Sequence, residues 1–208
     1  MAQLPPDNQV CEAYRQTRLS VVNLLSTTPE SSADLVVPAC PNWTVQQTFS
    51  HLVGVPEDLL AGRRDGITSD AWTNAQVQRH AGESLAELRS ALEATIASFD
   101  AMLPAIPPPS NSQLVMDAVT HELDLREALG VECEESSLPL SVAKAWLLDL
   151  IDRRGPSASA AIESANCLDL DLVRALTGRR SAAQMDDLGL PGALIVAALA
   201  GTPLKPPE

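Results

Sequence analysis

The sequence is poor in aromatic residues, in basic residues and in long apolar runs. Only 3% of its 208 residues are Phe, Trp or Tyr, whereas Ala and Leu, which favour helices, are abundant. Its 27 acidic residues outnumber its 14 Lys and Arg residues, which gives a net charge of −13. A chain this acidic, without a basic stripe, is not expected to bind nucleic acid or an anionic membrane surface.

Two further features are missing from the sequence. No apolar run approaches the roughly 20 residues that a membrane span requires. The N-terminal residues also lack the basic segment followed by an apolar segment that is typical of a signal peptide. We therefore expect a cytoplasmic protein with no membrane partner, either a monomer or a homodimer.

The cysteines lack the spacing of a metal or redox motif. The sequence contains Cys11, Cys40, Cys133 and Cys167, with no CxxC pair among them. A zinc knuckle or a redox motif is therefore not expected, and in a reducing cytosol the four residues are predicted to be free thiols. No cysteine is assigned a catalytic role.

Hydrophobic periodicity predicts four long amphipathic helices between residues 7 and 130. Thr44 with Gln47, and Ser84 with Glu87, form capping boxes that indicate where two of these helices begin. Because each apolar stripe must be buried against others, an all-α four-helix bundle is the simplest fold. The predicted helices span residues 7–27, 44–62, 84–103 and 110–130.

The remaining segments are patterned less clearly. Residues 35–41 are too short and too rich in proline for a helix, and residues 65–82 fit either a short helix or an ordered loop. A charged break after Gly130 predicts a boundary between a bundle domain, 1–130, and a small C-terminal region, 131–208. This region is expected to be mostly helical. Its predicted elements are helices at 141–153, 168–177 and 193–200, a short helix that begins after Ser181, and a short strand at 157–165.

Asp117 and His121 lie inside the apolar stripe of the fourth predicted helix. Four residues of helix place the two side chains about 40° apart around the axis and about 6 Å apart along it. A buried charge without a partner is too costly to keep, so the two side chains either satisfy each other or jointly hold something. With His51, close to the apolar face of the second helix, they form a set of two histidines and one carboxylate. Such a set suits a first-row divalent ion and leaves coordination positions open.

A purely structural interpretation of the same residues stays open. Asp117 could simply form a hydrogen bond with His121 across one helical turn, and His51 could be an ordinary core histidine. The third histidine, His80, lies in the polar stretch QVQRH. It is predicted to be a surface residue without a ligand role.

Several charged residues are candidates for other functional roles. Asp124 lies one turn beyond His121 and could orient a metal ligand or act as a base. Asp58 stands seven residues after His51, on the same helix face. For both, the alternative is an exposed helix acid. Arg179 and Arg180 could hold a substrate carboxylate, or they could only balance the dipole at the end of a helix.

Three runs of sequence resemble a known family. They are VPACPNWTVQQTFSHLVGVPEDLLAGR at 37–63, DAVTHELDLREALG at 117–130 and RALTGRRSAAQ at 174–184. In this order they resemble the mycothiol-dependent maleylpyruvate isomerase family, a branch of the DinB/YfiT-like metal-binding bundles. The resemblance covers most of residues 10–130 and reappears near 174–184.

The resemblance implies a DinB-like bundle that holds a divalent metal through His51, Asp117 and His121. Zinc is the most expected ion, with nickel, manganese or iron as alternatives, and Asp117 stands where the isomerase carries Glu. The implied activity is that of a transferase or isomerase in which the metal lowers the pKa of a small thiol, mycothiol, which attacks an electrophilic substrate. A hydrolase that uses metal-bound water, and a non-catalytic binding or stress-response bundle, are the alternatives. The C-terminal region looks shorter than that of the isomerase, so maleylpyruvate itself is not expected as the substrate.

Overall fold

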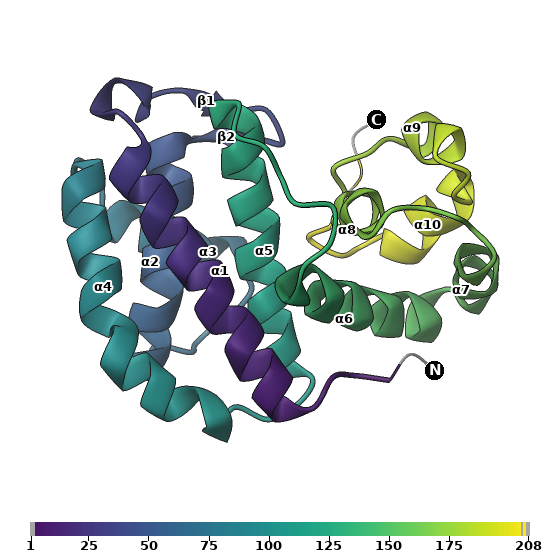
Figure 1. Ribbon diagram of the computed structural model, residues 1–208, viewed down its shortest axis with the longest axis horizontal. Helices are drawn as coiled ribbons and strands as arrows, with labels where there is room; N and C mark the ends of the chain where they lie inside the picture. The colour runs from purple at the N-terminus through teal and green to yellow at the C-terminus, as the bar shows by residue number, and fades with distance from the viewer. Residues whose placement is uncertain (1–2, 205, 207–208) are drawn as a thin grey trace. The chain divides into compact units, whose positions relative to one another are not determined.

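The computed structural model of the chain describes residues 3–204 and 206. It is mostly helical, as the sequence predicts, with a single two-stranded sheet in its described part. Four long helices, α1 (Asp7–Thr27), α2 (Val45–Leu60), α4 (Leu85–Met102) and α5 (Ser110–Leu129), make up the predicted bundle (Figure 1). None of the helices in the described part combines the length and the apolarity that a membrane span requires.

Two of the four helices begin at the capping boxes that the sequence predicts. At the start of α2, the Thr44 side chain accepts a hydrogen bond from the backbone N–H of Gln47, and the Gln47 side chain accepts one from the N–H of Thr44. Ser84 and Glu87 make the same reciprocal pair before α4. Each box satisfies two backbone donors that a helix start would otherwise leave without a partner.

A short hairpin leads directly into α2. Strand β1 (Val36–Val37) pairs antiparallel with β2 (Cys40–Thr44), and β2 ends at the residue that caps the helix. The sequence excluded a helix at residues 35–41 but did not reveal this pairing. Because no loop separates β2 from α2, Cys40 and Trp43 are held close to the first turns of the helix.

Helix α3 (Asp70–Arg79) occupies the segment that the sequence left ambiguous, and it packs against α2. The residue that follows it, His80, is only 4% exposed, so the prediction that it lies on the surface is wrong. Its Nδ1 lies 2.8 Å from a carboxylate oxygen of Glu83 and its Nε2 lies 3.0 Å from one of Glu57. These two carboxylates allow a histidine in a polar stretch to be buried.

The chain consists of two compact units. One unit comprises Met1–Tyr14, Pro107–Thr120 and Cys133–Glu208, and the other comprises Arg15–Ile106 and His121–Glu132. The division crosses α1 and α5, so each of these helices is one continuous element that contributes to both units. The predicted boundary near residue 130 stays a prediction.

The unit that contains α2, α3 and α4 has its own apolar core. Polar contacts join the helices around it: Arg18 of α1 donates two hydrogen bonds to Asp100 of α4, at 2.8 and 3.2 Å. Ser20 of α1 donates to Glu122 of α5, which also accepts from Arg126 at 2.8 Å. The largest fully buried side chains of this core are Phe49, Leu85, Leu88, Leu92, Phe99, Leu103 and Leu125.

The other unit contains the helices of the C-terminal region. These are α6 (Leu138–Arg154), α7 (Pro156–Glu163), α8 (Asp169–Leu176), α9 (Ala182–Asp187) and α10 (Gly192–Leu199). Their largest fully buried side chains are Leu147, Ile151, Leu176, Met185 and Ile195.

The strand predicted at 157–165 is wrong, because this segment forms α7. Pro156 occupies the first helical position, where its missing N–H is not needed. Three of the helix's eight residues are alanines, and alanine favours a helix over a strand.

The ion pair between Arg18 and Asp100 predicts a pH-dependent contribution to stability. Burial raises the pKa of Asp100, but hydrogen bonds and charge from Arg18 and Arg15 outweigh it, so the pKa of Asp100 lies below its usual value. The stabilisation is therefore fully present above the unfolded pKa of about 3.9 and is lost as the pH falls through the lower folded value. We expect Asp100→Asn to lower the free energy of unfolding by on the order of 1 kcal/mol at neutral pH, and by progressively less below about pH 4.

Urea denaturation of the wild type and of Asp100→Asn, from neutral pH to below about pH 4, measures this difference in the free energy of unfolding. A matched control is Glu93→Gln, because Glu93 contacts Arg89 only at 3.9 Å on the exposed surface of α4 and should contribute little. A difference between wild type and Asp100→Asn that does not change with pH would contradict the assignment.

Candidate metal centre

Two imidazole rings from distant parts of the chain meet inside the unit that contains α2. The ring centroids of His51 on α2 and His121 on α5 lie 4.8 Å apart, with the planes inclined at 81°. His51 is 3% exposed and the His121 side chain is 12% exposed. The rings therefore come close enough to bind the same small ion.

An indole covers both imidazoles. The ring centroid of Trp43 lies 5.3 Å from that of His51 and 5.4 Å from that of His121, and the indole is tilted against both rings. Trp43 is held there because β2 runs directly into α2. Sequence reasoning missed this residue, and its only signal is its position immediately before the capping Thr44.

The predicted carboxylate lies near the two imidazoles. Asp117 is one turn before His121 on the continuous helix α5 and is half-buried. One possible ligand atom from each of His51, Asp117 and His121 lies within 4.8 Å of the other two. Since donors about 2.1 Å from an ion lie at most about 4.2 Å apart, small side-chain adjustments would let this set hold one. Two imidazoles and a carboxylate fit a first-row divalent metal.

Each imidazole also has a polar partner at Nδ1. His51 Nδ1 lies 2.8 Å from Gln76 Oε1, and His121 Nδ1 lies 3.3 Å from Asp124 Oδ2. Metal-ligating histidines usually contact a carboxylate, a carbonyl or a water through the nitrogen that does not bind the metal. His51 therefore fits a role as an Nε2 ligand, and His121 offers one of its two ring nitrogens. Asp124 is completely buried, so its alternative interpretation as an exposed helix acid is wrong.

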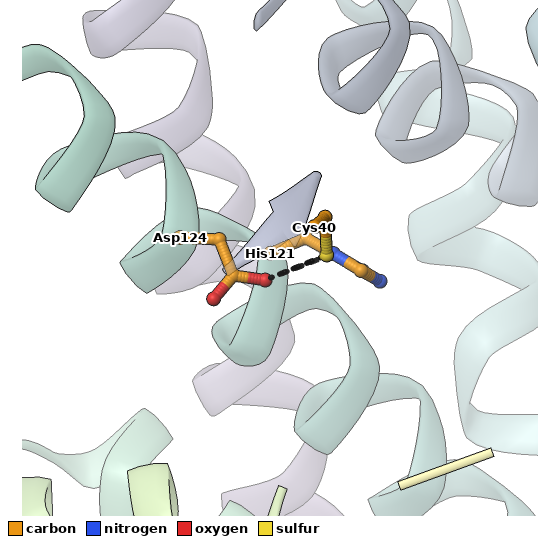
Figure 2. Close-up of side chains that lie close together, drawn as sticks. All are labelled: Cys40, His121 and Asp124. Atoms are coloured by element: carbon orange, nitrogen blue, oxygen red, sulfur yellow. Dashed lines mark hydrogen bonds and ion pairs between the residues drawn. The ribbon is translucent and has the colours of Figure 1, made fainter. Parts of the chain in front are cut away.

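A second group of potential ligands shares His121. Cys40, His121 and Asp124 also offer ligand atoms within 4.8 Å of one another. Figure 2 shows Cys40, which comes from β2, beside the two residues of α5, and the Cys40 thiol donates to Asp124 Oδ2 at 3.5 Å. All four cysteines are free thiols, as the sequence predicts. Nothing local in the sequence links Cys40 to the centre, because its partners lie more than 80 positions further along the chain.

The two arginines proposed to hold a substrate lie in the other unit, after α8. Arg179 donates to the Thr177 carbonyl at 2.6 Å, and Arg180 donates to the Arg179 carbonyl at 3.0 Å. Arg180 also lies 4.0 Å from Asp171 at the start of the same helix. Thr177 is the C-cap of α8, so the contact of Arg179 with its carbonyl is the kind expected from balancing the helix dipole. A role of Arg179 and Arg180 in substrate binding stays a prediction.

Comparison with protein families identifies one family that this chain matches. The family described as the mycothiol maleylpyruvate isomerase N-terminal domain matches residues 14–133. These residues include most of α1 and all of the hairpin, α2, α3, α4 and α5. Comparisons with curated proteins and with solved structures found no match. Because the family model matches more than half of the chain, this protein belongs to the mycothiol maleylpyruvate isomerase N-terminal domain family.

Proposed function

We propose that the protein holds one divalent metal ion, most simply zinc, through His51, Asp117 and His121. We propose further that it uses the ion in a thiol-dependent transferase or isomerase reaction on a small electrophilic substrate, with mycothiol as the cosubstrate. The observation that carries the proposal is the convergence of one donor from α2 and two from α5, within 4.8 Å of one another. Membership of the mycothiol-related family supports the choice of thiol.

The three protein donors leave room for the reactants. A tetrahedral site with three protein ligands keeps its fourth position open, which is typical of catalytic rather than structural zinc. When bound, the ion would lower the pKa of a thiol at that position and so make it nucleophilic near neutral pH. Cys40, whose thiol donates a hydrogen bond to Asp124, lies close enough to His121 to compete for the ion.

The remaining side chains of the centre are assigned positioning roles. The Trp43 indole packs against both imidazoles, which restricts their rotation and shields them from water. Asp124 is fully buried, and its Oδ2 lies 3.3 Å from His121 Nδ1. We therefore assign it to orienting His121 rather than to proton transfer with the substrate.

The first test is metal content. We expect the purified protein to contain about one equivalent of a divalent ion. Both His51→Ala and Asp117→Ala should lower its metal affinity by more than the roughly 10–100-fold that loss of a supporting partner costs. The matched control is His80→Gln, which removes a buried histidine that contacts Glu57 and Glu83 instead of the centre. Elemental analysis and isothermal titration calorimetry measure both quantities, and a stoichiometric ion retained by His51→Ala would contradict the proposed ligand set.

The second test distinguishes the two groups of donors that share His121. If the ion is held by His51, Asp117 and His121, Cys40→Ser should change metal affinity by less than about threefold, because no metal–sulfur bond is lost. Asp117→Asn should lower it much more, because the charged ligand is removed. The opposite ranking in calorimetric titrations with zinc would place the ion at Cys40, His121 and Asp124.

The third test is thiol dependence. The metal-loaded protein, assayed on a panel of small electrophiles, should form products only when mycothiol is present. The rate should fall at least about 100-fold in His121→Ala, because loss of a ligand removes thiol activation. Hydrolysis of test esters without thiol would instead support metal-dependent hydrolysis. Loss of folding and metal together in His121→Ala, with no activity in the wild type, would indicate a non-catalytic bundle.

A further inference from the structure

We infer that Gln76 is a positioning residue that sets the tautomer of His51. In this inference a buried chain of hydrogen bonds, from Asp58 through Gln76 to His51, holds the proton on Nδ1 and presents the Nε2 lone pair to the metal. The metal role of His51 rests on the proposed function. The tautomer itself is a property of the metal-free protein and can be measured separately.

The chain of contacts is short and buried throughout. Gln76 Oε1 lies 2.8 Å from His51 Nδ1, and Gln76 Nε2 donates to Asp58 Oδ2 at 2.9 Å. Gln76 is fully buried, Asp58 is 1% exposed and His51 is 3% exposed. Water therefore has little access to these groups, and each hydrogen bond restricts the side chains that it joins.

The orientation of the Gln76 amide follows from its hydrogen bond with Asp58. Asp58 Oδ1 accepts hydrogen bonds from Arg63 and Arg79, and both guanidinium groups form ion pairs with it. A carboxylate in this position can only accept, so the NH2 group of Gln76 must face Asp58. The carbonyl oxygen of the same amide then faces His51.

The tautomer of His51 follows in turn. An amide oxygen accepts hydrogen bonds and cannot donate them, so the His51 nitrogen that contacts it must carry the proton. A neutral imidazole protonated at Nδ1 has its lone pair at Nε2, which is the atom available to a metal. The ion pairs of the buried Asp58 thus determine which nitrogen of His51 can act as a ligand.

Gly54 explains how Gln76 reaches His51. It lies one turn after His51 on α2, and a Cβ at this position would be 2.5 Å from Gln76 Cβ and 2.7 Å from Gln76 Cγ. Real side chains do not approach so closely, so any larger residue at position 54 would displace Gln76. The glycine allows α3 to pack near α2 at the point where the amide enters the centre.

Glutamine, rather than glutamate, fits the charge of this site. A carboxylate at position 76 could also accept from His51 Nδ1, but it would face the Asp58 carboxylate at the distance now spanned by a hydrogen bond. Two buried carboxylates in direct contact repel each other. The neutral amide bridges a carboxylate and an imidazole without adding charge.

The decisive measurement is the tautomer of His51 in the metal-free wild type. Long-range ¹H–¹⁵N NMR of protein labelled with ¹⁵N-histidine distinguishes the two ring nitrogens, and His51→Gln provides the assignment. We expect Nδ1 to be protonated and Nε2 unprotonated. A His51 ring protonated at Nε2 would overturn the inference without requiring any variant of Gln76 to fold.

Variants test whether Gln76 determines the tautomer of His51. Gln76→Met removes both hydrogen bonds at similar volume, and Gly54→Ala displaces the amide without changing it. Each should shift His51 toward the Nε2-protonated tautomer and lower metal affinity about 10–100-fold. The matched control is Gln46→Met, because the Gln46 side chain donates to the carbonyls of His80 and Glu83 and its loss should leave the His51 tautomer and metal affinity unchanged.

The outcomes separate this inference from the proposed function. An Nδ1-protonated His51 in a protein that binds no metal would support the hydrogen-bonded chain and refute the metal proposal. Tight metal binding by a protein whose His51 is protonated at Nε2 before metal loading would support the metal proposal and refute the hydrogen-bonded chain. Unchanged tautomer and unchanged affinity in a folded Gln76→Met protein would show that Gln76 does not position His51.

Discussion

The close approach of two imidazoles inside a helical bundle is the constraint on which the other features of this protein depend. Buried polar rings need partners: Gln76 Oε1 lies 2.8 Å from His51 Nδ1, and the Asp124 carboxylate lies 3.3 Å from His121 Nδ1. To supply the first partner, α3 must pack closely on α2, which Gly54 permits. The Trp43 indole that covers both rings requires β2 to run straight into α2.

The two histidines are supported by partners of different charge. Asp124 contributes a carboxylate beside His121, Asp117 contributes another on the same helix, and His51 contacts the neutral amide of Gln76. Two carboxylates match the charge of a divalent ion, whereas a third at position 76 would exceed it. The remaining negative charge lies on Asp58, which pairs with Arg63 and Arg79. Because Arg79 also lies 3.6 Å from Glu57, the two guanidinium groups face two carboxylates, and only the neutral amide of Gln76 contacts His51 at Nδ1.

Local patterns in the sequence predicted much of the fold and part of the centre. The four long helices, two of their starting caps and the spacing of Asp117 and His121 all depend on residues within a few turns of one another. The burial of His80 and of Asp58, and the places of Trp43, Cys40 and Gln76, depend on contacts between distant residues. No single-sequence periodicity encodes those contacts. The strand wrongly predicted at 157–165 has a different origin. The small residues of α7 carry too weak an apolar pattern to distinguish a helix from a strand.

The most direct test of the account is X-ray absorption spectroscopy of the zinc-loaded protein. The account predicts a first shell of nitrogen and oxygen only, at about 2.0–2.1 Å, with the multiple-scattering pattern of two imidazoles. That result would show that the buried histidines of α2 and α5 act as ligands of the same ion. A sulfur scatterer at about 2.3 Å, or the signature of a single imidazole, would contradict it.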